Sequence, residues 1–316
     1  MPARVKMRLR NALRHHAGAW SAYAALSRLR RAALSFLPDA MYIRLLYREN
    51  MGRRLNLHDP ATFTEKLQWM KLHDRNPLYT TLADKYAVRE FVKMKAGEQY
   101  LARLLGVYGS FDEIPFGSLP ERFVLKCAHD SGSGVICRDK AALDMGAARR
   151  KMSRALRANY YYASREWPYR GAVPRIIAEE YLEDGAPGGL RDYKIFCFGG
   201  KAEYVQVHLN REACHTANAY DRDWNFVDEQ FSNFPHDENV AVPRPERLDE
   251  MLWLAETLSE GLPFVRVDLY HLPERIVFGE MTFYPAGGMG RFASETFARH
   301  MGDLIDLGLC QTLGKP

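Results

Sequence analysis

The sequence has few cysteines, and those it has follow no pattern. The five cysteines among its 316 residues are scattered, and no two stand at CxxC spacing. Disulfide frameworks and zinc sites need grouped cysteines, so the sequence argues against both and favours a reducing compartment. No apolar run approaches the ~20 residues of a membrane-spanning helix. Arginines interrupt any apolar stretch near the N-terminus that could act as a secretory signal. We therefore expect a cytoplasmic protein.

Acidic residues are missing from positions 1–38, although this stretch carries eight arginines and lysines. The net charge of the whole chain is only +5, so the remainder is close to neutral, which argues against nucleic acid as a partner. We predict a basic helical segment over residues 1–50. For residues 1–37 the composition leaves two interpretations open. One is peripheral contact with anionic lipid at the inner face of the cytoplasmic membrane, and the other is a solvated or packed helix.

Two familiar catalytic signatures are also missing. The chain has no convincing Ser/His/Asp or Cys/His set, and it has no GxxxxGK[ST] phosphate loop.

A candidate β-hairpin over residues 264–283 is the strongest positive feature. β-Branched and aromatic residues flank a predicted turn at 271–274. Each strand carries one carboxylate, Asp268 or Glu280, and Thr282 shares a face with Glu280. If the strands pair, these oxygens can converge as hard ligands for Mg²⁺ shared with phosphates. The alternative is that each carboxylate simply pairs with a nearby base.

A glycine- and serine-rich loop between two short strand-like segments is the second feature. The loop consists of His129, Asp130, Ser131, Gly132, Ser133 and Gly134. Its backbone N–H groups could form an anion-binding nest, because glycines allow the backbone to approach a phosphate closely. Lys126, just before the loop, would add a point charge. An ordinary turn is the alternative.

Residues 175–182 are predicted as a short strand with two adjacent acids, Glu179 and Glu180. Neighbours in a strand point to opposite faces, so these two cannot share a role. One would face a cleft, and the other would face solvent or a basic neighbour.

Residues 192–209 are predicted as a second hairpin around the pair Gly199-Gly200. Asp192 and Lys194 share one face of its first strand. Residues 210–244 are predicted as polar loops, and an amphipathic helix follows over residues 245–260.

Two helices are predicted from their capping residues. Thr62 or Thr64 would begin a helix that runs through Leu72, and Asp84 would begin the next. Lys85 then lies in the first helical turn, where a lysine opposes the helix dipole. This favours an anionic partner for Lys85, with a solvated surface lysine as the alternative.

Together these segments resemble the ATP-grasp superfamily, and most closely its TupA-like branch, named for teichuronopeptide biosynthesis. The resemblance runs from about residue 63 to residue 290. The segments that carry it are FTEKLQWMKLHDR (63–75), ADKYAVREFV (83–92), FVLKCAHDSGSG (123–134), IAEEYL (177–182), DYKIFCFGG (192–200), and RVDLY with FGEMTFYPAGG (266–288).

The resemblance implies an α+β ATP-grasp fold, in which two α+β lobes grip ATP and a smaller helical or αβ domain precedes them. The expected organisation is the basic segment 1–50, a pre-grasp region 51–120, a lobe with the phosphate loop at 121–180, and a lobe with the metal hairpin at 181–316.

The resemblance also implies roles for individual residues. Lys85 and Lys126 would contact the phosphates, and residues 129–134 would close over them. Asp268 and Glu280 would hold Mg²⁺, and Arg266 would face the transferred phosphate, so that Arg266 and Lys126 are the catalytic candidates. Thr282 stands where most of these enzymes have a metal-binding asparagine. The strand 177–182 would receive adenine, and the remaining residues assigned to the nucleotide are Glu179, Glu180, Tyr181, Leu182, Asp192 and Lys194.

The expected function is an ATP- and Mg²⁺-dependent carboxylate–amine ligase that works through an acyl phosphate. Its substrates would belong to a bacterial surface polysaccharide or its precursor, for example a uronic acid and an amino acid. The alternatives are a kinase of a sugar hydroxyl, a glycosyltransferase, and a non-catalytic nucleotide-binding scaffold. The sequence indicates no oligomeric state.

Overall fold

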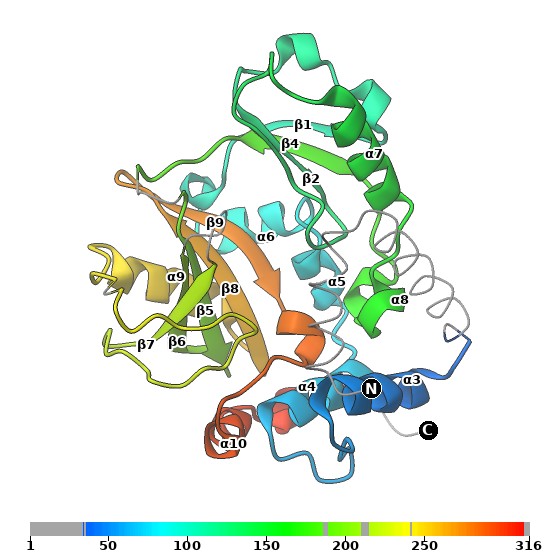
Figure 1. Ribbon diagram of the computed structural model, residues 1–316, viewed down its shortest axis with the longest axis vertical. Helices are drawn as coiled ribbons and strands as arrows, with labels where there is room; N and C mark the ends of the chain where they lie inside the picture. Colours follow the sequence, from blue (N-terminus) through cyan, green and yellow to red (C-terminus); the bar gives the residue numbers. More distant parts are fainter. Residues whose placement is uncertain (1–33, 35, 186–188, 210–214, 241, 313–316) are drawn as a thin grey trace.

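The computed structural model describes residues 34, 36–185, 189–209, 215–240 and 242–312. Of the basic segment predicted over residues 1–50, residues 1–33 and 35 lie outside the described residues, and the described remainder contains most of a helix, α3 (Asp39–Met51). Two antiparallel sheets form the body of the molecule, one above the other in Figure 1, with a group of helices below the second sheet. The four cysteines within the described residues, Cys127, Cys137, Cys197 and Cys310, are free thiols. Within the described residues no helix has both the length and the apolar content to cross a membrane.

The smaller sheet has the strand order β1-β4-β2-β3. Its strands are β1 (Leu104–Tyr108), β2 (Phe123–Cys127), β3 (Val135–Cys137) and β4 (Ile176–Glu180). Helix α7 (Met145–Leu156) covers it through Ala148 and Met152, which belong to its buried core. Asp144 begins α7 by accepting a hydrogen bond from Ala147 N at 2.8 Å. β1, which falls in the predicted pre-grasp region 51–120, pairs with β4 of this sheet. The domain boundaries themselves stay a prediction.

The larger sheet has the order β7-β6-β5-β8-β9. Its strands are β5 (Asp192–Phe198), β6 (Lys201–Leu209), β7 (Thr216–Asp221), β8 (Phe264–His271) and β9 (Ile276–Thr282). The β5–β6 hairpin turns at Gly199 and Gly200, both with positive φ, as predicted. One face packs on α9 (Leu248–Ser259), whose apolar stripe is buried. The opposite face carries the charged residues that concern the site.

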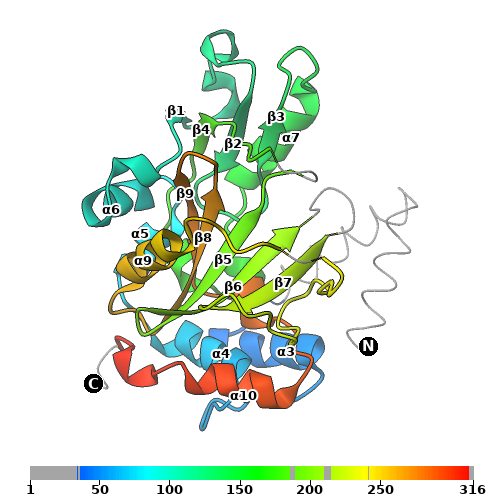
Figure 2. The same cartoon turned by 90° about the vertical axis from the view of Figure 1, so that its left-hand side faces the viewer.

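Helices α3 (Asp39–Met51), α4 (Phe63–His73) and α10 (Glu295–Asp303) form the layer beneath the larger sheet (Figure 2). Thr62 and Glu65 form a capping box at the start of α4, so the prediction for Thr62 is confirmed. α5 (Leu78–Ala83) and α6 (Val88–Lys95) lie between the sheets in Figure 1, and α8 (Tyr161–Ser164) lies to one side.

Three sequence predictions were wrong in detail. Asp84 accepts hydrogen bonds from Tyr86 N and Ala87 N and stabilises a turn, and α6 begins only at Val88, so Lys85 precedes the helix. The polar stretch 210–244 contains a strand, β7, which pairs with β6. The turn between β8 and β9 lies one residue later than predicted, because His271 and Ile276 are the last pair.

Candidate active site

Asp268 and Glu280 lie directly opposite each other on β8 and β9. A regular hairpin closing at His271 and Ile276 would place Glu280 on the other face, because side chains alternate. The register shifts by one residue between Asp268 and Leu269, and Gly279 is the residue that has no partner on β8. A Cβ at Gly279 would approach Asp268 O to 3.0 Å, so the bulge needs a residue without a side chain. The bulge therefore brings both carboxylates to one face.

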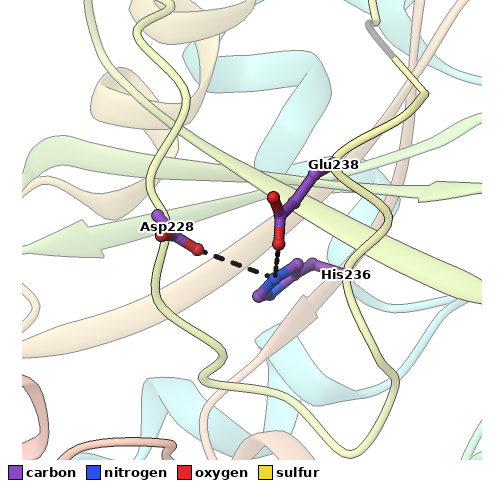
Figure 3. A group of neighbouring side chains, drawn as sticks. All are labelled: Asp228, His236 and Glu238. Atoms are coloured by element: carbon purple, nitrogen blue, oxygen red, sulfur yellow. Dashed lines mark ion pairs between the residues drawn. The ribbon is translucent and has the colours of Figure 1, made fainter.

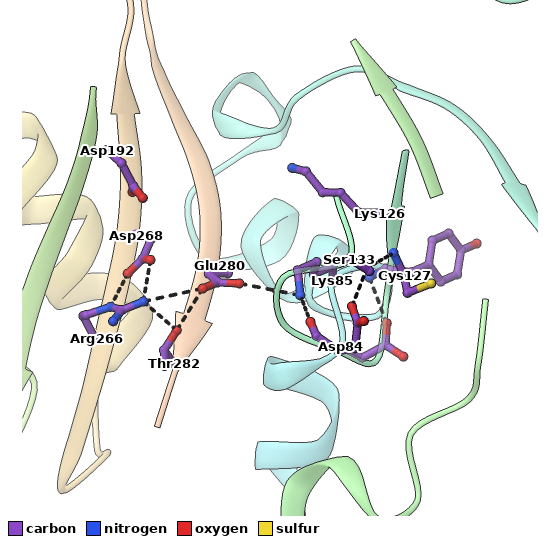
Figure 4. A network of polar contacts seen from close by, with 12 residues as sticks. Asp84, Lys85, Lys126, Cys127, Ser133, Asp192, Arg266, Asp268, Glu280 and Thr282 are labelled. Carbon is purple, nitrogen blue, oxygen red and sulfur yellow. Dashed lines mark hydrogen bonds and ion pairs between the residues drawn. The ribbon is translucent and has the colours of Figure 1, made fainter. Parts of the chain in front are cut away.

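Asp268 is buried beside two cations of the same sheet, Lys194 and Arg266, of which Figure 4 labels Arg266. Arg266 donates from Nε to Oδ1 at 2.6 Å and from Nη2 to Oδ2 at 2.7 Å, and Lys194 Nζ also donates to Oδ2. Lys194 contacts Asp192 Oδ2 at 2.6 Å as well. Burial raises the pKa of Asp268, and the two cations oppose that shift. The bidentate guanidinium fixes the carboxylate in one orientation.

Glu280 is more exposed, at 31% of its side chain, and it contacts both Lys85 and Arg266. Its Oε2 lies 3.6 Å from Lys85 Nζ, and its Oε1 lies 3.5 Å from Arg266 Nη2. Thr282 donates to Oε1 at 3.2 Å. Burial opposes ionisation, but Lys85 and Arg266 lower the pKa of Glu280 to about 2. The carboxylate is therefore ionised at neutral pH.

Lys126, at the end of β2, forms a second charged group in the smaller sheet. Its Nζ lies 2.8 Å from Glu179 Oε2, and Arg89 Nη1 lies 2.9 Å from Glu179 Oε1. Burial opposes the charge on Lys126, but Glu179 raises its pKa above the ordinary value. Lys126 is thus a permanent cation at neutral pH.

The loop 129–134 is held to both lysine-bearing segments. Lys85 N donates to Ala128 O at 2.9 Å, and Lys85 Nζ donates to Asp130 O. Ser133 donates to Asp130 Oδ1 at 2.6 Å and accepts from Cys127 N at 3.0 Å. Ser131 and Gly132 are exposed at the tip, where Gly132 has φ +91°. The tip thus offers backbone to a ligand, while Ser133 stabilises the base of the loop.

Other predicted site residues lie apart from the carboxylates. Glu180 points away from Glu179, as alternation predicts, and accepts from Arg275 Nη2 at 2.6 Å and from Arg103 N at 2.7 Å. Tyr181 lies beyond β4, with its ring 5.2 Å from the Arg122 guanidinium.

Two further predicted residues are buried or packed. His129 is buried, with Nε2 3.2 Å from Ala155 O. Leu182 packs on a small apolar cluster with Leu272 and Val277.

Sequence reasoning missed several residues that contact this region. Arg89 lies four residues after Lys85 and shares Glu179 with Lys126, a spacing that could have identified it. Lys71, fully buried on α4, donates to Ser164 O at 3.0 Å and to Gly287 O at 2.5 Å. No local pattern distinguishes it from a surface lysine, because its burial depends on loops far away in the sequence.

The arrangement is a continuous polar track across both sheets. Lys194, Asp268 and Glu280 are register partners on β5, β8 and β9, and Lys85 continues the track to the loop 129–134. Alternating fixed charges of this kind can hold an anion together with a divalent cation.

The chemistry of the donors fits Mg²⁺. Asp268 and Glu280 place carboxylate oxygens on one face, Thr282 adds a hydroxyl, and Mg²⁺ typically takes one or two carboxylates plus phosphate oxygens. Each carboxylate also pairs with nearby bases, as the alternative interpretation of the sequence predicted, and both Asp268 oxygens accept from Arg266 or Lys194. A different group, Asp228, His236 and Glu238, is the only set of three His, Cys, Asp or Glu ligands within the described residues whose ligand atoms lie within 4.8 Å of one another (Figure 3). His236 Nε2 is 3.6 Å from Asp228 and 3.5 Å from Glu238, and both acids are exposed, so ion pairing accounts for this group.

The comparisons with known proteins identify the family and the fold. The model of the TupA-like ATP-grasp family matches residues 65–306. No curated protein sequence matches the chain. The fold is that of the ATP-grasp enzymes, which are ATP-dependent ligases. The chain belongs to the TupA-like ATP-grasp family.

Solved ATP-grasp structures are similar at low identity. D-alanine–D-alanine ligase from Helicobacter pylori is 11% identical, with 80% of this chain and 70% of that chain covered and a TM-score of 0.43. The Bacillus anthracis D-alanine–D-alanine ligase complexed with ATP is 15% identical, with 74% and 68% covered and a TM-score of 0.43. A RimK domain ATP-grasp protein from Sphaerobacter thermophilus is 12% identical, with 72% and 69% covered and a TM-score of 0.40. Membership follows from the family match.

Proposed function

We propose that this enzyme uses ATP and Mg²⁺ to join the carboxylate of a bacterial surface polysaccharide, or of its precursor, to an amine. A uronic acid and an amino acid are the expected pair. The observation that carries the proposal is the Asp268–Glu280 register pair. Glu280 Oε2 lies 3.6 Å from Lys85 Nζ, and Lys85 links the larger sheet to the loop 129–134 through Asp130 O. Family membership supports the use of ATP.

The larger sheet would supply the metal site. Asp268 and Glu280 would hold Mg²⁺, with Thr282 as a weaker third ligand. When bound, the ion neutralises charge on the phosphates and helps to align them. Arg266, fixed by its bidentate contact with Asp268, would stabilise charge on the transferred phosphoryl group.

The smaller sheet would bind the nucleotide. Lys85 and Lys126 would contact phosphate oxygens, and residues 129–134 would exclude water. Glu179, rather than Glu180, lies beside both Lys126 and Arg89 and would face the nucleotide. Both lysines are paired with carboxylates, so phosphate binding would exchange one anionic partner for another and would not bring a bare charge out of water.

The reaction would run in two transfers. An oxygen of the acceptor carboxylate attacks the γ-phosphorus, the bond to the bridging oxygen breaks, and ADP leaves. The amine nitrogen then attacks the acyl carbon, the C–O bond to phosphate breaks, and the departing phosphate takes up the proton released by the amine. No protein nucleophile is needed, so the protein contributes orientation and charge.

The test is product analysis. Purified protein is incubated with ATP, Mg²⁺, a uronic acid donor and a mixture of amino acids, and the products are resolved by mass spectrometry. An amide formed with one ADP and one phosphate per product supports the proposal. A product that retains the phosphate would show a sugar kinase, and turnover of a nucleotide sugar without ATP would show a glycosyltransferase.

Peripheral membrane contact through residues 1–37 stays a prediction. Co-sedimentation with vesicles that contain anionic lipid, compared between the full chain and a chain lacking those residues, tests it. Equal co-sedimentation of the two chains would contradict it.

A further inference from the structure

Two tyrosines near the carboxylates have no part in the chemistry above. Tyr160 precedes α8, and Tyr169 ends the 3₁₀ turn η4 (Trp167–Tyr169). Their ring centroids lie 5.1 Å apart, with an interplanar angle of 67°. Both side chains are partly buried. The rings therefore form a two-sided aromatic corner.

Tyr79 on α5 connects this corner to the end of β9. Trp167, in the same turn as Tyr169, stacks on Tyr79 with centroids 5.9 Å apart, and Tyr79 stacks on Phe283 at 4.1 Å. Phe283 directly follows Thr282. One aromatic ring therefore separates η4 from the residue that follows the proposed metal ligands.

Buried hydrogen bonds fasten the segment that leads to Tyr169. Lys71 bridges Ser164 O and Gly287 O, so it joins this segment to the loop after β9. Ser164 donates to the buried Glu166 at 2.5 Å. A Cβ at Gly287 would lie 3.4 Å from Ser164 Cβ, which shows how closely the two segments approach.

The phenol groups of Tyr160 and Tyr169 both have raised pKa values. Burial, then the Glu166 and Glu280 carboxylates, raise the pKa of Tyr160 to about 12. Burial and the same two carboxylates raise the pKa of Tyr169 well above its ordinary value, and Arg266 opposes that shift. Both phenols therefore remain protonated hydrogen-bond donors across the physiological range.

We propose that Tyr160 and Tyr169 form the acceptor subsite and that its ligand is a pyranose sugar carrying the reacting carboxylate. Aromatic rings offer flat apolar faces to the C–H face of a sugar ring, while phenolic hydroxyls bond to sugar hydroxyls. A short aliphatic acid has no such face. This inference rests on the proposed function, because it places the sugar where Glu280 and Arg266 could act on its carboxylate.

The experiment is saturation-transfer difference NMR on D-glucuronate, using the full chain with ADP and Mg²⁺. Ring protons of the sugar should receive saturation from the protein. The double variant Tyr160→Leu/Tyr169→Leu should lower that signal about tenfold, and the double Tyr→Phe variant should retain most of it. Tyr162→Leu is the matched control, since Tyr162 lies in the same segment and is 49% exposed. Circular dichroism checks that each variant is folded.

Undiminished saturation transfer in the folded Leu double variant would overturn the inference, and so would succinate receiving saturation where glucuronate does not. The two proposals fail separately. Tyrosine-dependent binding of glucuronate without any amide product would refute the ligase alone. Amide formation with an unchanged acceptor KM in the Leu double variant would refute the tyrosine subsite alone.

Discussion

The larger sheet buries Asp268 between cations of its own strands, whereas the smaller sheet keeps Lys126 25% exposed and paired with Glu179. In the first case a bidentate arginine and a lysine fix the carboxylate from two sides. In the second, one carboxylate is shared by Lys126 and Arg89. The carboxylate of the larger sheet is thus fixed before any ligand binds, whereas Lys126 of the smaller sheet would exchange a carboxylate for a phosphate if it binds ATP as proposed.

The largest effect is expected at Glu280, which contacts both Arg266 of the larger sheet and Lys85. Glu280→Gln keeps the size of the side chain but removes the charge that faces Lys85 and Arg266. We expect Mg²⁺-dependent ADP formation to fall about a thousandfold. Glu274→Gln, the same change at the exposed turn of the hairpin, is the control and should be neutral. Unchanged activity in Glu280→Gln would remove Glu280 from the site.

Lys71 is expected to stabilise the loop that follows β9, the strand that carries Glu280. Lys71→Met leaves the Ser164 and Gly287 carbonyls without this donor and Glu166 without its buried cation. We expect the free energy of unfolding to fall by about 3 kcal/mol. Lys93→Met, at a half-exposed ion pair, should change it by less than about 0.5 kcal/mol. Urea unfolding measures both, and equal effects would contradict a specific role for Lys71.

The pH dependence of stability gives a second test of Lys71. Burial lowers the pKa of Lys71 from 10.5 to about 8. Between these values the unfolded chain binds more protons at this group than the folded protein does, so Lys71 makes the free energy of unfolding rise with pH. The difference between wild type and Lys71→Met should therefore grow from pH 8 to pH 10.5. A constant difference would show that the folded pKa is not lowered.

A substitution at Gly279 tests whether the register of β9 against β8 matters for activity. Gly279→Ala places a Cβ 3.0 Å from the backbone oxygen of Asp268. We expect a loss of about 2 kcal/mol in stability together with reduced ADP formation. Gly117→Ala is the control, because nothing lies within 4 Å of its Cβ position. Full activity in Gly279→Ala would show that the carboxylates tolerate a changed register.

The smallest effect is expected in the smaller sheet, at Lys126. Lys126→Met removes one proposed phosphate contact, and we expect the KM for ATP to rise about tenfold with little change in stability. Steady-state kinetics measure it, and Lys93→Met again serves as the control. A loss of unfolding free energy in Lys126→Met as large as that in Lys71→Met would show that the Lys126 ion pair is also a structural contact.

The sequence predicted those features that depend on local pattern. Alternation and turn residues identified the β5–β6 hairpin, the capping threonine Thr62 began α4, and the pattern of acids separated Glu179 from Glu180. These predictions succeed because each rests on residues that are neighbours in the chain. The strand β7 was missed because its sequence, TANAYD, is polar and its pairing comes from β6.

By itself the sequence indicated the family, the β5–β6 and β8–β9 hairpins and the residue types of the candidate site. Only the tertiary structure decided which of these residues face one another. The bulge at Gly279 turns Glu280 onto the face of Asp268, and distant loops bury Lys71 beside Ser164 and Gly287. Local periodicity fixes the direction of a side chain relative to its own strand, whereas register and burial depend on contacts between segments far apart in the chain.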